Sequence, residues 1–225
     1  FPEICGRICP QDRLCEGNCV IEKGFESVTI GAVEKHITET AFENGWVKPP
    51  TPREERPESI GIIGAGPAGL AAADMLRRRG YQVEIYDRYD RVGGLLIYGI
   101  PGFKLEKDIV ERREKLLRDG GVTFHLNVDI GGDTSFAELR EKHDAVLIAT
   151  GVYKARDLNI DGAERDGVIP ALDFLTASNR LGMGDDLSSD ETDRYFAEGR
   201  RVVVIGGGDT AMDCVRTAIR QKAAS

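Results

Sequence analysis

Four of the five cysteines lie within the first nineteen residues of the 225-residue sequence, at the spacing C-x3-C-x5-C-x3-C. They are Cys5, Cys9, Cys15 and Cys19. A secreted disulfide framework would spread its cysteines over a small domain, so this distribution favours a reducing compartment, and hence the cytoplasm. The spacing is not that of a zinc ribbon, and thiolates bunched in a loop with Pro10 and Gly17 also suit an iron–sulfur cluster. From spacing alone an iron–sulfur cluster, a zinc site, and disulfides or free thiols remain open.

A glycine-rich phrase after a short apolar run indicates a second kind of chemistry. Residues 60–63 predict a strand, GAGPAG at 64–69 predicts a tight loop, and 67–79 predict an Ala-rich helix. A second predicted strand, 82–86, ends on Asp87. This order of strand, G-x-G-x-x-G, helix, strand and acid is the dinucleotide-binding fingerprint.

The glycines of this phrase have separate physical roles. Gly64 makes the tight turn, Gly66 lets the backbone approach a pyrophosphate, and Gly69 lets the helix pack close to the strand. The N-terminus of the helix offers free N–H groups and a partial positive charge to the phosphates. Asp87 is then placed to accept hydrogen bonds from the ribose hydroxyls.

The same pattern restarts near the end of the sequence. Residues 202–205 predict a strand, GGGDTA at 206–211 predicts a loop with Ala211 in place of the third glycine, and a helix to about residue 220 follows. Two fingerprints indicate two nucleotides on one chain. Because the sequence stops before the next strand and opens inside the cysteine motif, we interpret it as an excerpt of a longer protein.

The elements that position these motifs divide the chain into five segments. Apolar residues at helical spacing predict a helix from about Ile30 to 43, the Pro-rich run 48–53 predicts an extended linker, and 104–119 predict a charged amphipathic helix. The expected segments are a helical metal-binding segment (1–50), a linker (51–58), the first part of a nucleotide-binding domain (59–160), a connecting segment with an acidic insertion (161–199) and the start of a second nucleotide-binding domain (200–225). The alternation of strands and helices predicts an α/β fold.

Composition excludes several classes of function. A net charge of −8 argues against a nucleic-acid partner, and the longest apolar run, 145–149, is far too short to span a membrane. His36, His125 and His143 are scattered without a Ser or Cys partner, so we expect surface or packing roles for them and predict no acid–base or nucleophilic residue.

Several phrases together resemble the small (beta) subunit of bacterial NADPH-dependent glutamate synthase. They are CGRICPQDRLCEGNC (5–19), IGAVEKHITETAF (30–42), GAGPAGLAAA (64–73), DRVGGLLIYGIPGFKLEK (90–107), ATGVYKARDL (149–158) and GGGDTAMDCVRTAIRQ (206–221). The electron-input half of dihydropyrimidine dehydrogenase and the large subunit of ferredoxin-linked NADH/NADPH transhydrogenases are similar in order.

The resemblance implies a helical domain with two [4Fe-4S] clusters, followed by Rossmann-like FAD and NADPH domains of the disulfide-reductase type. NADPH would give a hydride to FAD, and single electrons would pass through the clusters to a large (alpha) subunit that makes glutamate from glutamine and 2-oxoglutarate. The alternatives are a related oxidoreductase with another acceptor, and a non-catalytic zinc-binding interaction module. Because the family's upstream cysteines and later segments are missing, we expect the excerpt alone to be inactive.

The resemblance also assigns site residues by position. Those expected at FAD are Gly64, Ala65, Gly66, Pro67, Ala68, Gly69, Asp87, Gly94, Leu95, Lys104, Ile130, Thr150 and Gly151. Those expected at NADPH are Gly206, Gly208, Asp209, Thr210 and Ala211. Cys9, Cys15 and Glu34 would share one cluster and Cys19 would belong to the other, although Glu34 could also be a plain solvated helix residue. Cys5 matches a non-ligand position and is expected to be a buried thiol, and Cys214 is expected to pack in the core.

Overall fold

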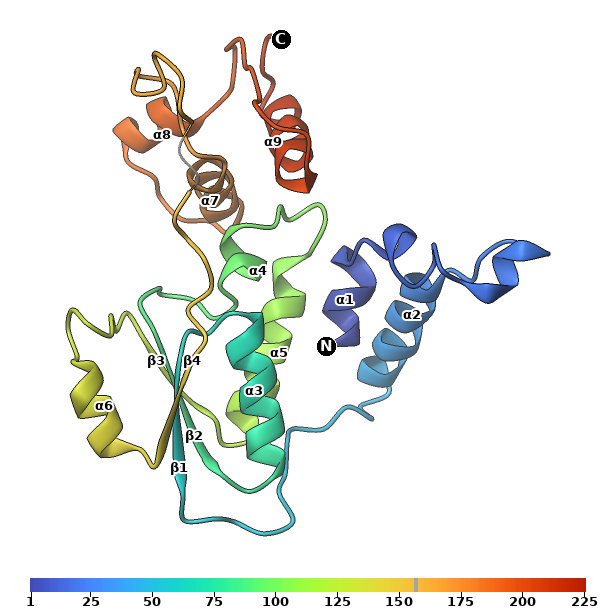
Figure 1. Ribbon diagram of the computed structural model, residues 1–225, viewed down its shortest axis with the longest axis vertical. Helices are drawn as coiled ribbons and strands as arrows, with labels where there is room; N and C mark the ends of the chain where they lie inside the picture. Colours follow the sequence, from blue (N-terminus) through green and yellow to red (C-terminus); the bar gives the residue numbers. More distant parts are fainter. Residues whose placement is uncertain (156–157) are drawn as a thin grey trace.

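The centre of the computed structural model, which describes residues 1–155 and 158–225, is a parallel sheet in the order β3-β2-β1-β4 (Figure 1). The strands are β1 (Ser59–Ile63), β2 (Gln82–Asp87), β3 (Thr123–Leu126) and β4 (Ala145–Ile148). Ile62 of β1 lies opposite Ile85 of β2 and is fully buried, as expected for a parallel strand covered on both faces. The predicted α/β fold and its first two strands are therefore confirmed.

Two long helices pack on the sheet and contribute to its core. They are α3 (Pro67–Arg78) and α5 (Lys107–Asp119), whereas the short helices α4 (Leu95–Tyr98) and α6 (Phe136–Lys142) lie in the connections. Leu70 and Leu117 are fully buried against Ile62 in one apolar cluster. The helix predicted from residue 104 begins three residues later, because residues 101–105 form a turn in which Pro101 O accepts the N–H groups of Lys104 and Leu105.

The N-terminal residues form an arm beside the sheet domain (Figure 1). It contains α1 (Pro2–Ile8), α2 (Ile30–Glu43) and the 3₁₀ turns η1 (Gln11–Arg13) and η2 (Val20–Lys23). The two helices approach so closely that a Cβ added to Gly6 would lie 2.8 Å from Gly31 O. Val33 and Ile37, two apolar residues of α2, are 44% and 62% exposed.

Ion pairs fasten the arm to α5. Arg7 of α1 donates hydrogen bonds to Glu39 of α2 and to Glu106 at the start of α5, and the donor–acceptor distance is 2.9 Å in both. The buried Glu3 accepts a hydrogen bond of 2.7 Å from Arg113 of α5. The predicted linker is extended but not free, since Pro50 is fully buried.

The C-terminal part consists of α7 (Ala171–Gly182), α8 (Ser189–Tyr195) and α9 (Asp209–Arg220). Cys214 packs between α7 and α9 in a small apolar cluster, which confirms its expected core position. The strand predicted at 202–205 is wrong for the described residues, and Val203 is 87% exposed. A strand needs a neighbour for its backbone hydrogen bonds. Within the described part of the chain, Val202 alone of residues 202–205 makes such a bond, from its N–H to Ser225 O.

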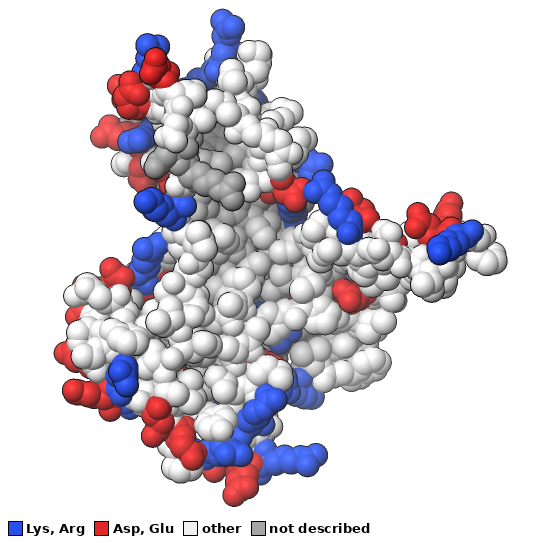
Figure 2. Space-filling model, viewed as in Figure 1, with Lys and Arg blue, Asp and Glu red and all other residues white. Residues whose placement is uncertain are grey.

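Charged side chains lie at the periphery of the face seen in Figure 2, and its middle is mostly uncharged. This uncharged region covers the junction between the sheet domain and the C-terminal helices. Among the described residues, no helix has the length and apolar character needed to cross a membrane.

Candidate functional site

The loops that follow β1, β2 and β4 meet at the carboxyl edge of the sheet. A Cβ on Gly64 would clash with the Ala149 carbonyl after β4. Gly93 N–H, after β2, donates to Ala65 O over 2.9 Å. A Cβ on Gly94 would lie 2.9 Å from the Cα of Gly66. Three strand ends thus form one surface, at the place where open α/β sheets bind ligands.

The three glycines of the 64–69 loop differ in their surroundings. Gly64 has φ = 112°, a left-handed conformation that favours glycine. A Cβ on Gly69 would clash with Gly64 O, so the first turn of α3 packs directly on the loop. A Cβ on Gly66 would meet no atom of residues 1–155 and 158–225 within 4 Å. The open space above Gly66, at the N-terminus of α3, fits the pyrophosphate of FAD.

Asp87 holds the loop as well as facing the site. Its two carboxylate oxygens accept the N–H groups of Ala65 (2.6 Å) and Tyr89 (2.9 Å). Asp87 is 9% exposed and Ala65 is fully buried. Each carboxylate oxygen has a second lone pair, which leaves acceptor capacity for a ribose hydroxyl.

A cavity of about 390 Å³ lies beside this surface and includes Leu95 in its lining. Tyr89 and Tyr153 pack beside each other, with 5.8 Å between their ring centres, and the Cζ of Arg88 lies 4.9 and 4.8 Å from those centres. Burial, together with a hydrogen bond to Asp90, raises the pKa of Tyr98, which also lines the cavity. These aromatic residues could not be predicted as site residues from the sequence, because isolated tyrosines carry no spacing signal.

The remaining residues expected at FAD occupy different places. Gly151 follows β4 with φ = 70°, next to the exposed Thr150, and Ile130 bridges Thr134 after β3. Lys104 instead pairs with Asp213 of α9, with 3.0 Å between Nζ and Oδ2. It therefore connects the sheet domain to the C-terminal helices.

The second glycine loop leads into α9 as the first leads into α3. Gly206 has φ = 143°, and Gly208 is the N-cap of α9. Ala211 takes the place of the third glycine, where its Cβ lies 3.4 Å from a Cβ built on Gly206. Asp209 and Thr210 are exposed in the first turn, so backbone N–H groups at this helix start can receive a phosphate.

The cysteines of the arm form an incomplete ligand set. Cys9 is exposed at the surface. Partial loss of solvent around its thiol is the main cause that raises the pKa, and the nearby charges of Cys5, Cys15 and Glu34 raise it further. Among the described residues, no three His, Cys, Asp or Glu side chains are close enough to hold a metal ion. Exposed thiols with a carboxylate nearby fit part of a cluster's ligands. The expected burial of Cys5 is wrong, since α1 turns Glu3 and Ile4 inward and Cys5 outward.

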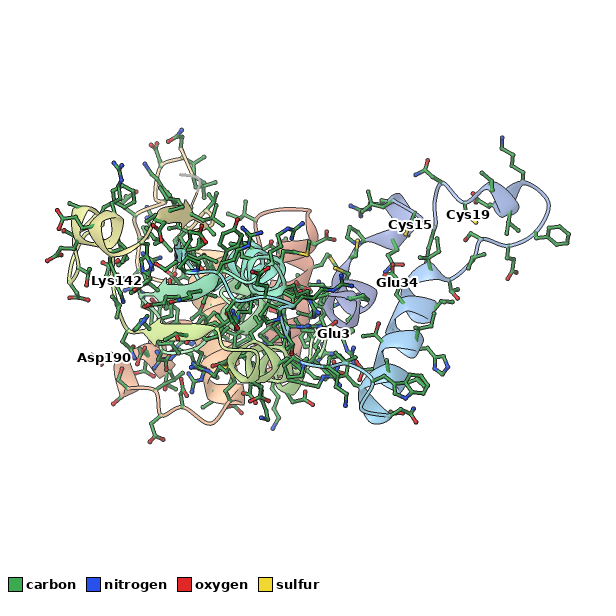
Figure 3. All side chains as sticks on the ribbon, turned by 90° about the horizontal axis from the view of Figure 1, so that it is seen from below. Glu3, Cys15, Cys19, Glu34, Lys142 and Asp190 are labelled. Carbon is green, nitrogen blue, oxygen red and sulfur yellow. The ribbon has the colours of Figure 1, made fainter. Side chains whose placement is uncertain are left out.

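Cys19 lies apart from this group. Figure 3 shows it further out along the arm than Cys15 and Glu34. Backbone hydrogen bonds from Val28 and Ile21 lower its pKa and stabilise the thiolate, the form that binds metal. A thiolate at this position fits a metal or cluster ligand.

Two protein-family models match the chain. The model described as "Pyridine nucleotide-disulphide oxidoreductase" matches residues 58–224, and "Dihydroprymidine dehydrogenase domain II, 4Fe-4S cluster" matches residues 1–46. The chain belongs to the pyridine nucleotide-disulphide oxidoreductase family. The two models confirm the expected cofactor classes, FAD, NADPH and [4Fe-4S] clusters, and favour iron–sulfur over zinc for the cysteines.

The chain also has high sequence identity to individual named proteins. The chain is 64% identical to a protein named glutamate synthase [NADPH] small chain from Azospirillum brasilense, matching 100% of this chain and 47% of the relative. It is 68% identical to a putative glutamate synthase [NADPH] small chain from Cereibacter sphaeroides, at 100% and 54%. The resemblance inferred from the sequence is thereby confirmed, and the chain spans about half the length of these relatives.

A solved structure agrees with the fold. FprA from Mycobacterium tuberculosis, in complex with NADPH, is 31% identical with a TM-score of 0.61, covering 72% of this chain and 36% of that one.

Proposed function

We propose that this chain belongs to the electron-input module of a glutamate synthase. The observation that carries the proposal is the packing of the cysteine arm on α4, the helix that begins directly after Gly94. Ile4 of α1 lies in one buried apolar cluster with Leu96 and Ile97 of α4. Because α4 begins at Leu95, directly after Gly94, the cysteine-bearing arm and the proposed flavin surface share one rigid contact.

Residues of the sheet edge would bind FAD, and the loop before α9 would bind NADPH. The backbone at Gly64–Ala68 would hold the FAD pyrophosphate, and Asp87 the adenosine ribose. The backbone at Gly208–Ala211 would hold the NADPH phosphates. Bound together, the cofactors supply hydride transfer and single-electron transfer. The tyrosines around Leu95 would shield this side of the site from water.

Cys9, Cys15 and Glu34 would ligate one cluster, and Cys19 the other. The electrons would leave through the arm to a large subunit that forms glutamate from glutamine and 2-oxoglutarate. The separate place of Cys19, further out along the arm than Cys15 and Glu34, supports this division.

Electron paramagnetic resonance of the reduced protein tests the ligand assignment. Cys9→Ser and Cys15→Ser should each abolish the same cluster signal, and Cys19→Ser should abolish the other. Cys5→Ser and the buried control Cys214→Ser should leave both signals. If Cys5→Ser and Cys9→Ser lost the same signal, the division would be wrong.

Two assays test the rest of the proposal. Anaerobic addition of NADPH should bleach the flavin absorbance of the full-length protein. With the large subunit, NADPH oxidation should depend on both glutamine and 2-oxoglutarate. Flavin bleaching without that dependence would assign the module to an oxidoreductase with another acceptor.

A further inference from the structure

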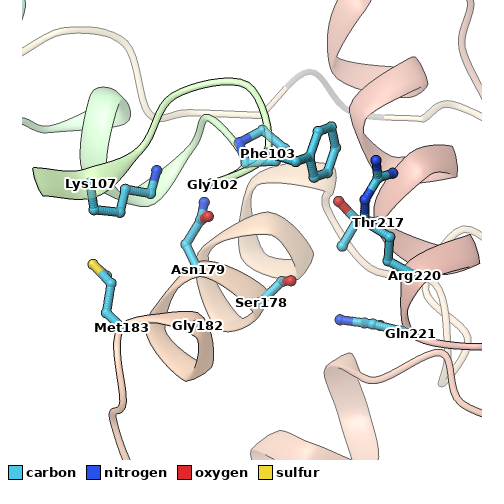
Figure 4. A pocket seen from close by; sticks show the side chains of 11 residues that line it. Gly102, Phe103, Lys107, Ser178, Asn179, Gly182, Met183, Thr217, Arg220 and Gln221 are labelled. Carbon is cyan, nitrogen blue, oxygen red and sulfur yellow. The ribbon is translucent and has the colours of Figure 1, made fainter. Parts of the chain in front are cut away.

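A second cavity, of about 200 Å³, lies between the turn before α5, the end of α7 and the last turns of α9 (Figure 4). Its lining comes from residues 101–107, 178–183 and 217–221, and not from the two glycine loops. The polar side chains in it are Lys107, Ser178, Asn179, Thr217, Arg220 and Gln221. Within the described part of the chain no Asp or Glu lines it, although acidic residues outnumber basic ones by 38 to 30 in the sequence.

Two buried polar atoms in this lining lack a partner among the described residues. The Thr217 hydroxyl is one, in a residue only 4% exposed. The side-chain nitrogen of Gln221 is the other, whereas its Oε1 accepts Ala197 N–H over 3.0 Å. Buried polar groups in native proteins are normally hydrogen-bonded to protein, water or ligand. Both groups can donate, so they select a ligand that accepts hydrogen bonds.

Two cations face the cavity from opposite sides (Figure 4). Arg220 lies over the Phe103 ring, with 3.8 Å from Cζ to the ring centre, and gives one hydrogen bond to Arg216 O. Lys107 donates to the carbonyls of Leu96 (3.0 Å) and Ile100. An ammonium has three donors, so one remains, and the guanidinium also keeps N–H groups for a ligand.

We propose that this cavity binds a small dicarboxylate. One carboxylate would lie against Arg220, Thr217 and Gln221, and the other against Lys107. The volume of the cavity is below the roughly 300–1,000 Å³ of sites for drug-sized ligands, so a small ligand fits it. Phe103 and Met183 line the cavity with apolar surface that suits a short carbon chain. The inference does not depend on the proposed function, since it uses neither nucleotide site nor cysteine.

Such a ligand would join the two parts of the molecule. Residues 101–107 connect α4 to α5 in the sheet domain, whereas Thr217 and Arg220 belong to α9. A bound dicarboxylate would therefore hold α9, which follows the second glycine loop, against the segment next to the proposed flavin surface.

Titration calorimetry on the full-length protein with its cofactors tests binding directly. Succinate is the probe, and we expect a dissociation constant of about 1 mM or lower. Succinamide, a neutral molecule of similar shape, should bind at least about tenfold more weakly, because it lacks both charges. Inorganic phosphate should also bind more weakly than succinate, since it reaches one end only.

Two variants locate the site. Arg220→Gln should weaken succinate binding about ten- to a hundredfold, and Thr217→Val about five- to tenfold. Arg216→Gln, an exposed residue one turn earlier on α9 and outside the lining, is the matched control and should bind like the wild type. Absence of saturable succinate binding, unchanged binding in Arg220→Gln, or tighter binding of phosphate than of succinate would each overturn the proposal.

Discussion

The three glycines of the 64–69 loop have different neighbouring atoms. Substituting each of them therefore distinguishes an effect on folding from an effect on flavin binding. Gly66→Ala places a methyl group in open space, so the free energy of unfolding of the flavin-free protein should change by less than about 0.5 kcal/mol. The same methyl group would obstruct a pyrophosphate, and flavin retention after dialysis should fall.

The neighbouring glycines provide the matched controls. Gly64→Ala and Gly69→Ala force a Cβ against backbone atoms and should each lower the free energy of unfolding by about 1–3 kcal/mol in urea denaturation. Wild-type flavin retention in Gly66→Ala would contradict the placement of the pyrophosphate.

Asp87 also combines two roles. Asp87→Ala removes the acceptor of the buried Ala65 N–H, so the flavin-free protein should lose about 1–3 kcal/mol of unfolding free energy. If the carboxylate also binds the ribose, flavin affinity should fall about ten- to a hundredfold. Asp193→Ala, at an exposed position of α8, should change neither quantity. Unchanged flavin occupancy in Asp87→Ala would refute the ribose assignment.

At the scale of elements, Glu39 links α2 to both α1 and α5. Hydrogen bonds from Arg112 and Arg7 lower its pKa from 4.5 to about 2. A carboxyl whose pKa is lower in the folded state stabilises the fold above its unfolded pKa, and this contribution is lost as pH falls. Glu39→Gln should therefore cost about 1–3 kcal/mol at pH 7, and the difference from wild type should shrink as pH falls from about 4.5 to about 2.

The control for this experiment lies on α5. Glu114 pairs with Arg118 one turn away on the same helix, so Glu114→Gln should cost at most about 0.5 kcal/mol. Chemical denaturation followed by circular dichroism measures both variants. A cost for Glu39→Gln that does not change with pH would mean that packing, not charge, holds the arm.

For the whole molecule, Lys104–Asp213 ties the sheet domain to α9. Lys104→Met would leave Asp213, which is 6% exposed, buried without its cation. The free energy of unfolding should fall by about 1–3 kcal/mol. In a double-mutant cycle with Asp213→Asn, the two costs should sum to clearly more than the cost of the double variant. Simple additivity would show that the pair does not couple the two parts.

The sequence by itself determined the fold class, the two glycine loops and helix α2. These features depend on local rules: the conformation open to Gly64, the apolar run of β1 and the helical period after Ile30 are properties of short segments. For the same reason the roles of Gly64 and Gly69 could be predicted before any contact was known.

Only the tertiary structure decided how distant segments meet. The sequence could not place Gly94 against Gly66 or pair Lys104 with Asp213, because these contacts join residues far apart in the chain. It also predicted a strand at 202–205 from apolar character alone. A strand forms only where another offers its backbone groups, and that depends on the folded molecule, not on the segment.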